Sequence, residues 1–464
     1  MMRGLEFQVE WREPSPDDDA FGPETRTWAA LAIRLDGALV SLNHPADWKS
    51  DADREFVVGG MSGLAEWLVE NWTYLLWETH PPFPRAPVHP GSAVPRIPSL
   101  RDAHGGWRDL DPDIPRVDVA RWQHRHSFGH GSSPLAVPSI VFLPDERAVG
   151  VLVDHLPSQI DPTVRFSPGP DRDAWPADPV WVRREDLGLS LSEFVSSVLD
   201  RAKRHKDARG WAVWLDKAWQ AERVRADDKE HRRKLMFGDV VASRWSDLEK
   251  ELGERLAALE GLLADSLPPA ADSEIDFLRG LAVEQRACAP AVPEPLDLDG
   301  LERSLPPFIQ GYRLAVRLRD ALGLHEDPVV DLPGLLHDRF GVSVQPIGSK
   351  GMFRAAVVAS SSGGCLWYAN DDPRFSGVPP VRFAVAAALG RWVSEVTSSA
   401  RFFGAAHGPQ ARVRETQRAN AFAAEFLLPG RVAGVCRDIE AVAAEYGISR
   451  SAAEWQRANH LAKG

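Results

Sequence analysis

The chain has 464 residues, of which 44% are hydrophobic and 26% charged, a composition typical of a globular protein long enough for several domains. Its formal net charge of −12 argues against broad, non-specific binding to nucleic acid, which needs a surplus of Lys and Arg. Three widely spaced cysteines argue against a disulfide framework or a four-cysteine zinc site. Because no membrane span and no signal-peptide core are recognisable, we expect a cytoplasmic protein.

Residues 1–184 are interpreted as a tryptophan-rich α+β domain, since the 17 tryptophans concentrate in the first half of the chain. Leu5–Trp11 alternates apolar and polar residues, as a half-buried strand does. Trp28–Leu42 contains two apolar runs around Asp36-Gly37, a hairpin signal. Phe56–Glu78 carries an apolar face at helical spacing. The tryptophans are expected to pack in the core of this domain.

Three histidines in this domain are candidate metal ligands. His124, His126 and His130 lie close together, and imidazole is a common zinc donor. No cysteine or carboxylate at fixed spacing completes a ligand set, so a polar loop is the favoured interpretation. A metal site here stays open as an alternative.

Residues 185–290 are predicted to be helical. An apolar seam recurs at steps of three and four residues from Val241 to Leu263, which predicts one helix of about six turns that pairs with another helix of this chain or of a second copy. Proline-rich breaks at Pro268-Pro269 and Pro290–Pro295 follow it, and we place a domain boundary near residue 290.

The last third alternates helix and strand patterns. They predict a helix at Leu332–Phe340, then strands at Gly341–Gln345, Met352–Ser360 and Gly364–Asn370, and an apolar helix at Arg382–Val393. This arrangement assigns residues 291–464 to a third domain of an α+β, multi-domain chain.

Three segments of this domain occur in a recognisable order. The first, Arg382–Arg391, reads RFAVAAALGR, the second, Ala419–Pro429, reads ANAFAAEFLLP, and the third is the turn Tyr446–Ser449, YGIS. In this order and spacing they resemble the ImmA/IrrE family of zinc metallopeptidases over about residues 300–462. The resemblance implies a zincin-like fold with a helix-turn-helix-like tail.

The zinc motif of that family is degenerate here. Ala387 stands at the first histidine of HExxH, Ala388 at the general-base glutamate and Arg391 at the second histidine. Glu415 lies one residue out of register with the third ligand, whose place Thr416 takes. Alanine cannot ligate and a guanidinium repels a cation, so the resemblance predicts neither a metal, a cofactor nor a catalytic residue at these positions.

Buried charges must be paired. We therefore expect Arg391 to pair with Glu415 or Glu425 in the vacated pocket. Rescue of a metal by His407, Glu395 or His337 is disfavoured.

A peptide-binding cleft is expected beside the apolar helix. Strand addition would use Gly364–Asn370 as an edge strand. The cleft candidates are Leu366, Tyr368, Asn370 and Asn420.

These observations predict an inactive ImmA/IrrE-like pseudo-peptidase that acts as a regulatory or protein-binding component. The resemblance implies a protein or peptide partner, for instance a repressor, in a mobile-element, stress or defence circuit. One alternative is an active metal-dependent peptidase with a non-standard site. Another is a DNA-binding regulator that uses Arg450 and Arg457 of the tail.

Overall fold

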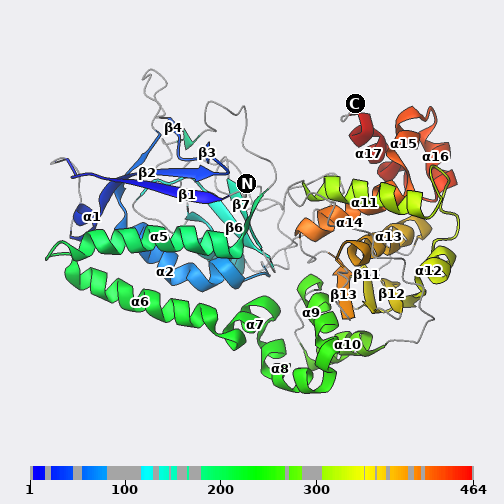
Figure 1. The fold of residues 1–464 in the computed structure, drawn as a ribbon, viewed down its shortest axis with the longest axis horizontal. Helices are drawn as coiled ribbons and strands as arrows, with labels where there is room; N and C mark the ends of the chain where they lie inside the picture. The colour runs from blue at the N-terminus through cyan, green and yellow to red at the C-terminus, as the bar shows by residue number, and fades with distance from the viewer. Residues whose placement is uncertain are drawn as a thin grey trace. The chain divides into compact units, whose positions relative to one another are not determined.

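The computed structural model divides the chain into two compact units of mixed α and β structure (Figure 1). Unit 1 comprises Met1–Phe83 and Arg96–Met236, and unit 2 comprises Pro84–Pro95 and Phe237–Gly464. The structure describes residues 4–15, 22–44, 55–80, 116–128, 135–145, 148–153, 165–166, 179–266, 271–284, 306–349, 351–360, 363–371, 377–395, 402–408 and 413–461. Within these ranges, no helix has both the length and the apolar character that a membrane span requires.

The strands of unit 1 form small antiparallel sheets. One has the order β1-β2-β3 with β5 paired to β2, another has the order β6-β7-β9, and β4 pairs with β8. The predicted strand and the predicted hairpin are confirmed, and Asp36 and Gly37 have the positive φ values that the tight turn needs. The strands are β1 (Leu5–Trp11), β2 (Trp28–Leu35), β3 (Ala38–Leu39), β4 (Asn43–His44), β5 (Val57–Gly60), β6 (Ile140–Pro144), β7 (Ala148–Val153), β8 (Arg165–Phe166) and β9 (Val180–Arg183).

Helices pack against these sheets through tryptophan and aliphatic side chains. The predicted helix at Phe56–Glu78 proves to be strand β5 followed by a helix, because Gly59-Gly60 continues the sheet before the helix begins. Trp72 and Trp219 meet edge to face at 4.4 Å, which supports the expected packing role. The helices are α1 (Pro23–Arg26), α2 (Ser62–Trp77), α3 (Arg116–His126), α5 (Arg184–Lys203), α6 (Arg209–Asp227) and α7 (Lys229–Phe237).

Unit 2 is built around a four-stranded sheet of order β10-β12-β11-β13. The pair β10–β12 is parallel and the other two pairs are antiparallel. The strands are β10 (Val342–Ile347), β11 (Ala355–Ser360), β12 (Gly363–Ala369) and β13 (Phe402–His407). The last strand was not predicted. The three predicted strands are confirmed, with shifted ends.

Helices cover both faces of this sheet. They are α8 (Asp239–Leu252), the short 3-10 helix η2 (Gly253–Arg255), α9 (Leu256–Asp265), α10 (Asp272–Val283), α11 (Pro307–Ala321), α12 (Leu332–Phe340), α13 (Val378–Glu395), α14 (Val413–Leu427), α15 (Gly430–Val435), α16 (Ile439–Tyr446) and α17 (Arg450–Leu461).

The two faces of β11 show how the layers are arranged. Ala355, Val357 and Ala359 point to one face and belong to the core that contains α13. Their neighbours Ala356 and Val358 point the other way and are also buried. This second face is covered by α9, and α10 packs against α9 (Figure 1).

The unit boundary therefore falls within the predicted helical region rather than near residue 290. A sheet that is apolar on both faces must be covered on both. Helix α9 provides the second cover and α8 and α10 pack against it, so all three belong to the same unit as α11–α17. The predicted three-domain division separated α9 from the sheet that it covers.

The predicted six-turn helix is interrupted. Gly253 takes a φ of 52° at the end of α8, and α9 begins at Leu256. Val241, Trp245, Leu248, Leu259 and Leu263 of the seam are nevertheless all buried. Of the two predicted alternatives, pairing with a helix of the same chain is observed, with a bend in place of one straight helix.

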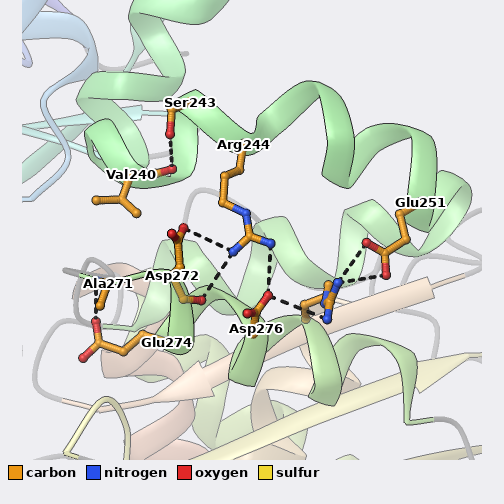
Figure 2. Close-up of polar contacts among 9 residues, drawn as sticks. Val240, Ser243, Arg244, Glu251, Ala271, Asp272, Glu274 and Asp276 are labelled. Carbon is orange, nitrogen blue, oxygen red and sulfur yellow. Dashed lines mark hydrogen bonds and ion pairs between the residues drawn. The ribbon is translucent and has the colours of Figure 1, made fainter.

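Ion pairs connect α8 and α10 on the outer surface of unit 2. Figure 2 shows Arg244 between Asp272 and Asp276, at 3.3 and 3.0 Å. Arg279 of α10 in turn lies 3.0 Å from Glu251 of α8. These partly exposed pairs set the register of the two helices more than they stabilise them.

The contact between α9 and β13 depends on two glycines. A Cβ on Gly404 would lie 2.1 Å from the carbonyl oxygen of Ala258. A Cβ on Gly261 would lie 1.9 Å from the carbonyl oxygen of Gly404. Glycine is required at both positions because the two backbones touch directly.

Gly404→Ala should destabilise unit 2 by about 1–3 kcal/mol, because the new methyl group cannot fit without moving α9. The free energy of unfolding is measured by chemical denaturation, and hydrogen exchange of the β13 amides reports the local effect. The matched control is Gly280→Ala in α10, where a Cβ meets nothing within 4 Å. This control should stabilise the chain by about 0.5–1 kcal/mol. Equal effects of the two substitutions would contradict the close packing.

Candidate functional site

The positions that the resemblance assigns to the zinc motif lie in the buried part of α13. Ala387, Ala388 and Arg391 are each no more than 1% exposed. The two alanines pack in the core of unit 2, and Gly390 beside Arg391 contacts the ring of Phe422 on α14 closely. Two methyl groups and one cation thus stand where the resemblance places two zinc ligands and the general base.

Arg391 forms a buried, two-pronged ion pair with Asp265, the last residue of α9. The Nη2–Oδ2 distance is 2.7 Å and the Nη1–Oδ1 distance is 3.2 Å. The side chains are 1% and 0% exposed. Parallel guanidinium–carboxylate hydrogen bonds of this kind are strong and directional.

The ion pair lies at the outer edge of β13. Arg354 donates its N–H to the carbonyl of His407, so the polar backbone groups of His407 point toward β11. Those of Ala406 therefore point away from β11. The Ala406 N–H donates to Asp265 Oδ2 at 3.4 Å. Asp265 therefore caps the edge of β13 while it pairs with Arg391 across the strand.

A carboxylate partner for Arg391 was expected, and the buried pair confirms it, but the named partners were wrong. Glu425 accepts hydrogen bonds from the Gly430 N–H and from Gln456, and Glu415 lies in the first turn of α14. Asp265 takes the role because the end of α9, on the other face of the sheet from α13, lies against the edge strand β13. It stands 126 residues before Arg391, and a single charged residue after an apolar seam gave no signal of this contact.

His407 lies in the same polar cluster. It is 4% exposed, and its Nδ1 atom is buried without a hydrogen-bond partner in the described part of the chain. Burial, with the charges of Arg354 and Arg391, lowers the pKa of this imidazole to about 3, although Asp265 acts in the opposite direction. The ring is therefore neutral near pH 7.

The other proposed metal ligands do not converge. His337 is exposed and contacts its neighbour Asp338. Across the residues that the structure describes, no group of three His, Cys, Asp or Glu side chains is arranged to hold a metal ion. Thr416, at the place of the third ligand, is buried, and its hydroxyl has no hydrogen-bond partner among the residues that the structure describes.

The expected edge strand is not an edge. β12 lies between β10 and β11 and pairs with both, so its backbone groups are already used. Strand addition at Gly364–Asn370 was therefore a wrong prediction. Of the cleft candidates, Leu366 is buried in the core, Tyr368 and Asn420 are partly buried, and Asn370 is exposed.

The histidines of unit 1 are also separated. His124 and His126 lie on α3, where residues two apart face different directions. His124 is exposed, whereas His126 is buried and lies 2.8 Å from Glu78. The polar-loop prediction was wrong at these two positions, and His130 lies outside the described residues.

The His126 contact belongs to a compensated charge cluster. Burial acts to raise the pKa of Glu78, but the hydrogen bond and charge of His126, together with Arg125, outweigh it and lower that pKa. Trp122 stacks on the His126 ring at 4.3 Å, and Arg125 lies over Tyr74. The cluster ties α3 to the end of α2.

The tail packs into unit 2. Gly447 takes the left-handed conformation between α16 and α17, and Ala443 and Tyr446 belong to the core. Arg450, a proposed DNA contact, is held between Glu440 and Glu454. Its charge is compensated within the tail, which reduces its capacity to bind phosphate.

No family model, curated protein or solved structure matches this chain. The resemblance to ImmA/IrrE peptidases rests on the three sequence motifs.

Removal of one partner of the buried pair should cost about 3–5 kcal/mol, because the other charge is left alone in the core. We expect this loss for Asp265→Ala, measured by denaturant unfolding. The double variant Asp265→Leu/Arg391→Met should recover most of it. The exposed Arg450→Ala serves as control and should leave stability near wild type. A double variant as unstable as the single one would contradict the ion-pair explanation.

Acid should weaken unit 2 through His407. In the unfolded chain the imidazole protonates near pH 6.5, whereas the folded chain keeps it neutral to about pH 3. The unfolded state therefore binds more protons between these values, and stability falls as pH falls below about 6.5. From pH 7 to pH 5 the loss from this group is about 2 kcal/mol.

The measurement is hydrogen-exchange protection of β13 at the two pH values. His407→Gln should lower stability but remove this part of the pH dependence. If the variant keeps the full wild-type slope, the effect arises from other groups.

Proposed function

We propose that unit 2 is a non-catalytic form of the ImmA/IrrE peptidase fold and that the protein serves as a regulatory or protein-binding component. The observation that carries this proposal is the buried pair of Arg391 with Asp265. It supplies a cation where the resemblance puts a metal ligand, and a second protein group holds that cation in place.

The chemistry of these residues supports the proposal. A zinc peptidase needs about three protein ligands and a water that a general base activates. Ala387 and Ala388 carry no donor or base, and an arginine side chain such as that of Arg391 is always a cation under the conditions in which proteins fold. A positive charge fixed in the core disfavours a divalent cation beside it.

The ion pair also performs a structural task that a metal would perform. A bound metal links elements that are distant in sequence, and here the pair links α13 to α9 across β13. The chain thus keeps a tie at this position without hydrolytic groups. A protein partner of the repressor type, in a mobile-element, stress or defence circuit, is what the resemblance implies for such a component.

Purified wild-type protein should retain far less than about one zinc ion per chain after dialysis, and it should not cleave an unfolded protein substrate with or without added zinc. Elemental analysis and a peptide-release assay measure the two quantities. Zinc retained at about one per chain, together with cleavage that a chelator abolishes, would overturn the proposal.

A graft variant tests the resemblance separately. It combines Ala387→His, Arg391→His and Thr416→Glu with Asp265→Ala, so that no buried carboxylate is left unpaired. If unit 2 has the zincin-like arrangement, this variant should bind about one zinc ion, whereas a control with Asp265→Ala and Arg391→His alone should not.

A further inference from the structure

Unit 1 contains an open depression of about 450 Å³ along the exposed face of α5. The indole of Trp11, at the end of β1, forms one wall, and the remaining lining residues belong to α5 and its C-terminal cap. The depression lies in the tryptophan-rich part of the chain, for which the sequence suggested no function.

Polar groups line this depression without protein partners. The hydroxyls of Ser192, Ser196 and Ser197 form no hydrogen bond to any other residue that the structure describes. Asp200 and Arg204 have the i, i+4 spacing that favours an ion pair, yet no such pair forms between them in the described chain.

Charges nearby behave differently. Lys203 on the same helix pairs with Asp216 at 2.8 Å, and Arg26 pairs with Asp207 at 2.8 Å. The unpaired groups are therefore gathered at the depression, where both donors and acceptors remain available.

Arg201 joins the aromatic wall to these groups. Its guanidinium lies over the ring of Trp11 at 5.8 Å and donates Nη2 to Glu13 at 3.2 Å. Its Nε atom is buried and has no hydrogen-bond partner within the described ranges. A buried donor of this kind is costly unless a ligand or water accepts from it.

The mixture of groups restricts the class of ligand. Glu193 and Asp200 disfavour an anion, whereas Arg201 and Arg204 disfavour a cation. Three hydroxyls disfavour a wholly apolar ligand. A neutral molecule with many hydroxyl groups and one flat C–H face satisfies both the alternating donors and acceptors and the indole wall.

We propose that this depression, formed by Trp11, Arg201 and the serine-rich face of α5, is a binding site for a sugar. The C–H face of the sugar packs on the indole of Trp11. Its hydroxyls donate to the carboxylates of Glu193 and Asp200 and accept from Arg201 and Arg204. This site is independent of the function proposed for unit 2.

The test is saturation-transfer NMR on the full-length protein with maltose and with N-acetylglucosamine, each up to about 10 mM. We expect saturable binding of at least one of these probes, with transfer strongest at the ring C–H protons. Ser196→Trp fills the depression at an exposed position and should weaken binding at least about tenfold. Arg201→Gln should also weaken it.

Ser451→Trp, at an exposed serine of α17, is the matched control and should bind like wild type. Trp11→Ala is a less specific test, because Trp11 also packs against the core of unit 1 and its loss can destabilise the fold. Adenosine and inorganic phosphate are the competing probes. No saturable sugar binding, binding that survives Ser196→Trp, or tighter binding of adenosine or phosphate than of either sugar would each overturn the proposal.

Discussion

The ion pair between Arg391 and Asp265 determines how unit 2 is assembled. A guanidinium on the buried face of α13 requires a carboxylate, because an isolated charge in a core costs several kcal/mol. Asp265 can supply it only if the end of α9 lies against β13, and the glycines at 261 and 404 allow the backbones to approach that closely. One buried charge thus connects α13 and α9, which lie on opposite faces of the sheet, through the edge strand β13.

This coupling also changes how the sheet can interact with other chains. β12 is internal, and Asp265 takes an outward-pointing N–H group of β13. The opposite edge is β10, where Pro346 lacks an N–H group and interrupts the row of donors. Neither edge offers the long, regular row of backbone groups that strand addition uses. The protein partner proposed above would therefore bind through side chains on the helical surfaces and not by extension of the sheet.

Local patterns predicted local structure well. The helix Leu332–Phe340 and the strand Leu5–Trp11 have the predicted ends, because periodicity and the flanking turn residues both specify them. β13 escaped prediction, since FFGAAH is short, contains a glycine and shows no alternation. The prediction that β12 is an edge strand was wrong for a different reason. Strand order follows from tertiary pairing, which the pattern of a single strand does not contain.

The candidate site, too, could be predicted only in part. That Ala387, Ala388 and Arg391 stand where the resemblance would place zinc ligands and a general base could be seen in the sequence, and so could the need of Arg391 for a carboxylate. The identity of that carboxylate could not, because Asp265 becomes a neighbour only when α9 folds over the sheet. His126 shows the same limit, since its contact with Glu78 depends on how α3 packs against α2.

In both units the buried charged side chains named here are paired or hydrogen-bonded, and the α5 depression differs from this pattern. Arg391 has Asp265, Glu78 has His126 and Arg125, and Arg319 donates to the carbonyls of His325, Asp327 and Phe426. Where groups of both signs are instead left without partners around an indole, solvent or a ligand must satisfy them. Solvent can satisfy the exposed serines and carboxylates at little cost. What distinguishes the depression from other solvated surface is the indole of Trp11 beside these groups, because an apolar wall next to unpaired donors and acceptors suits a ligand that carries both a C–H face and hydroxyls.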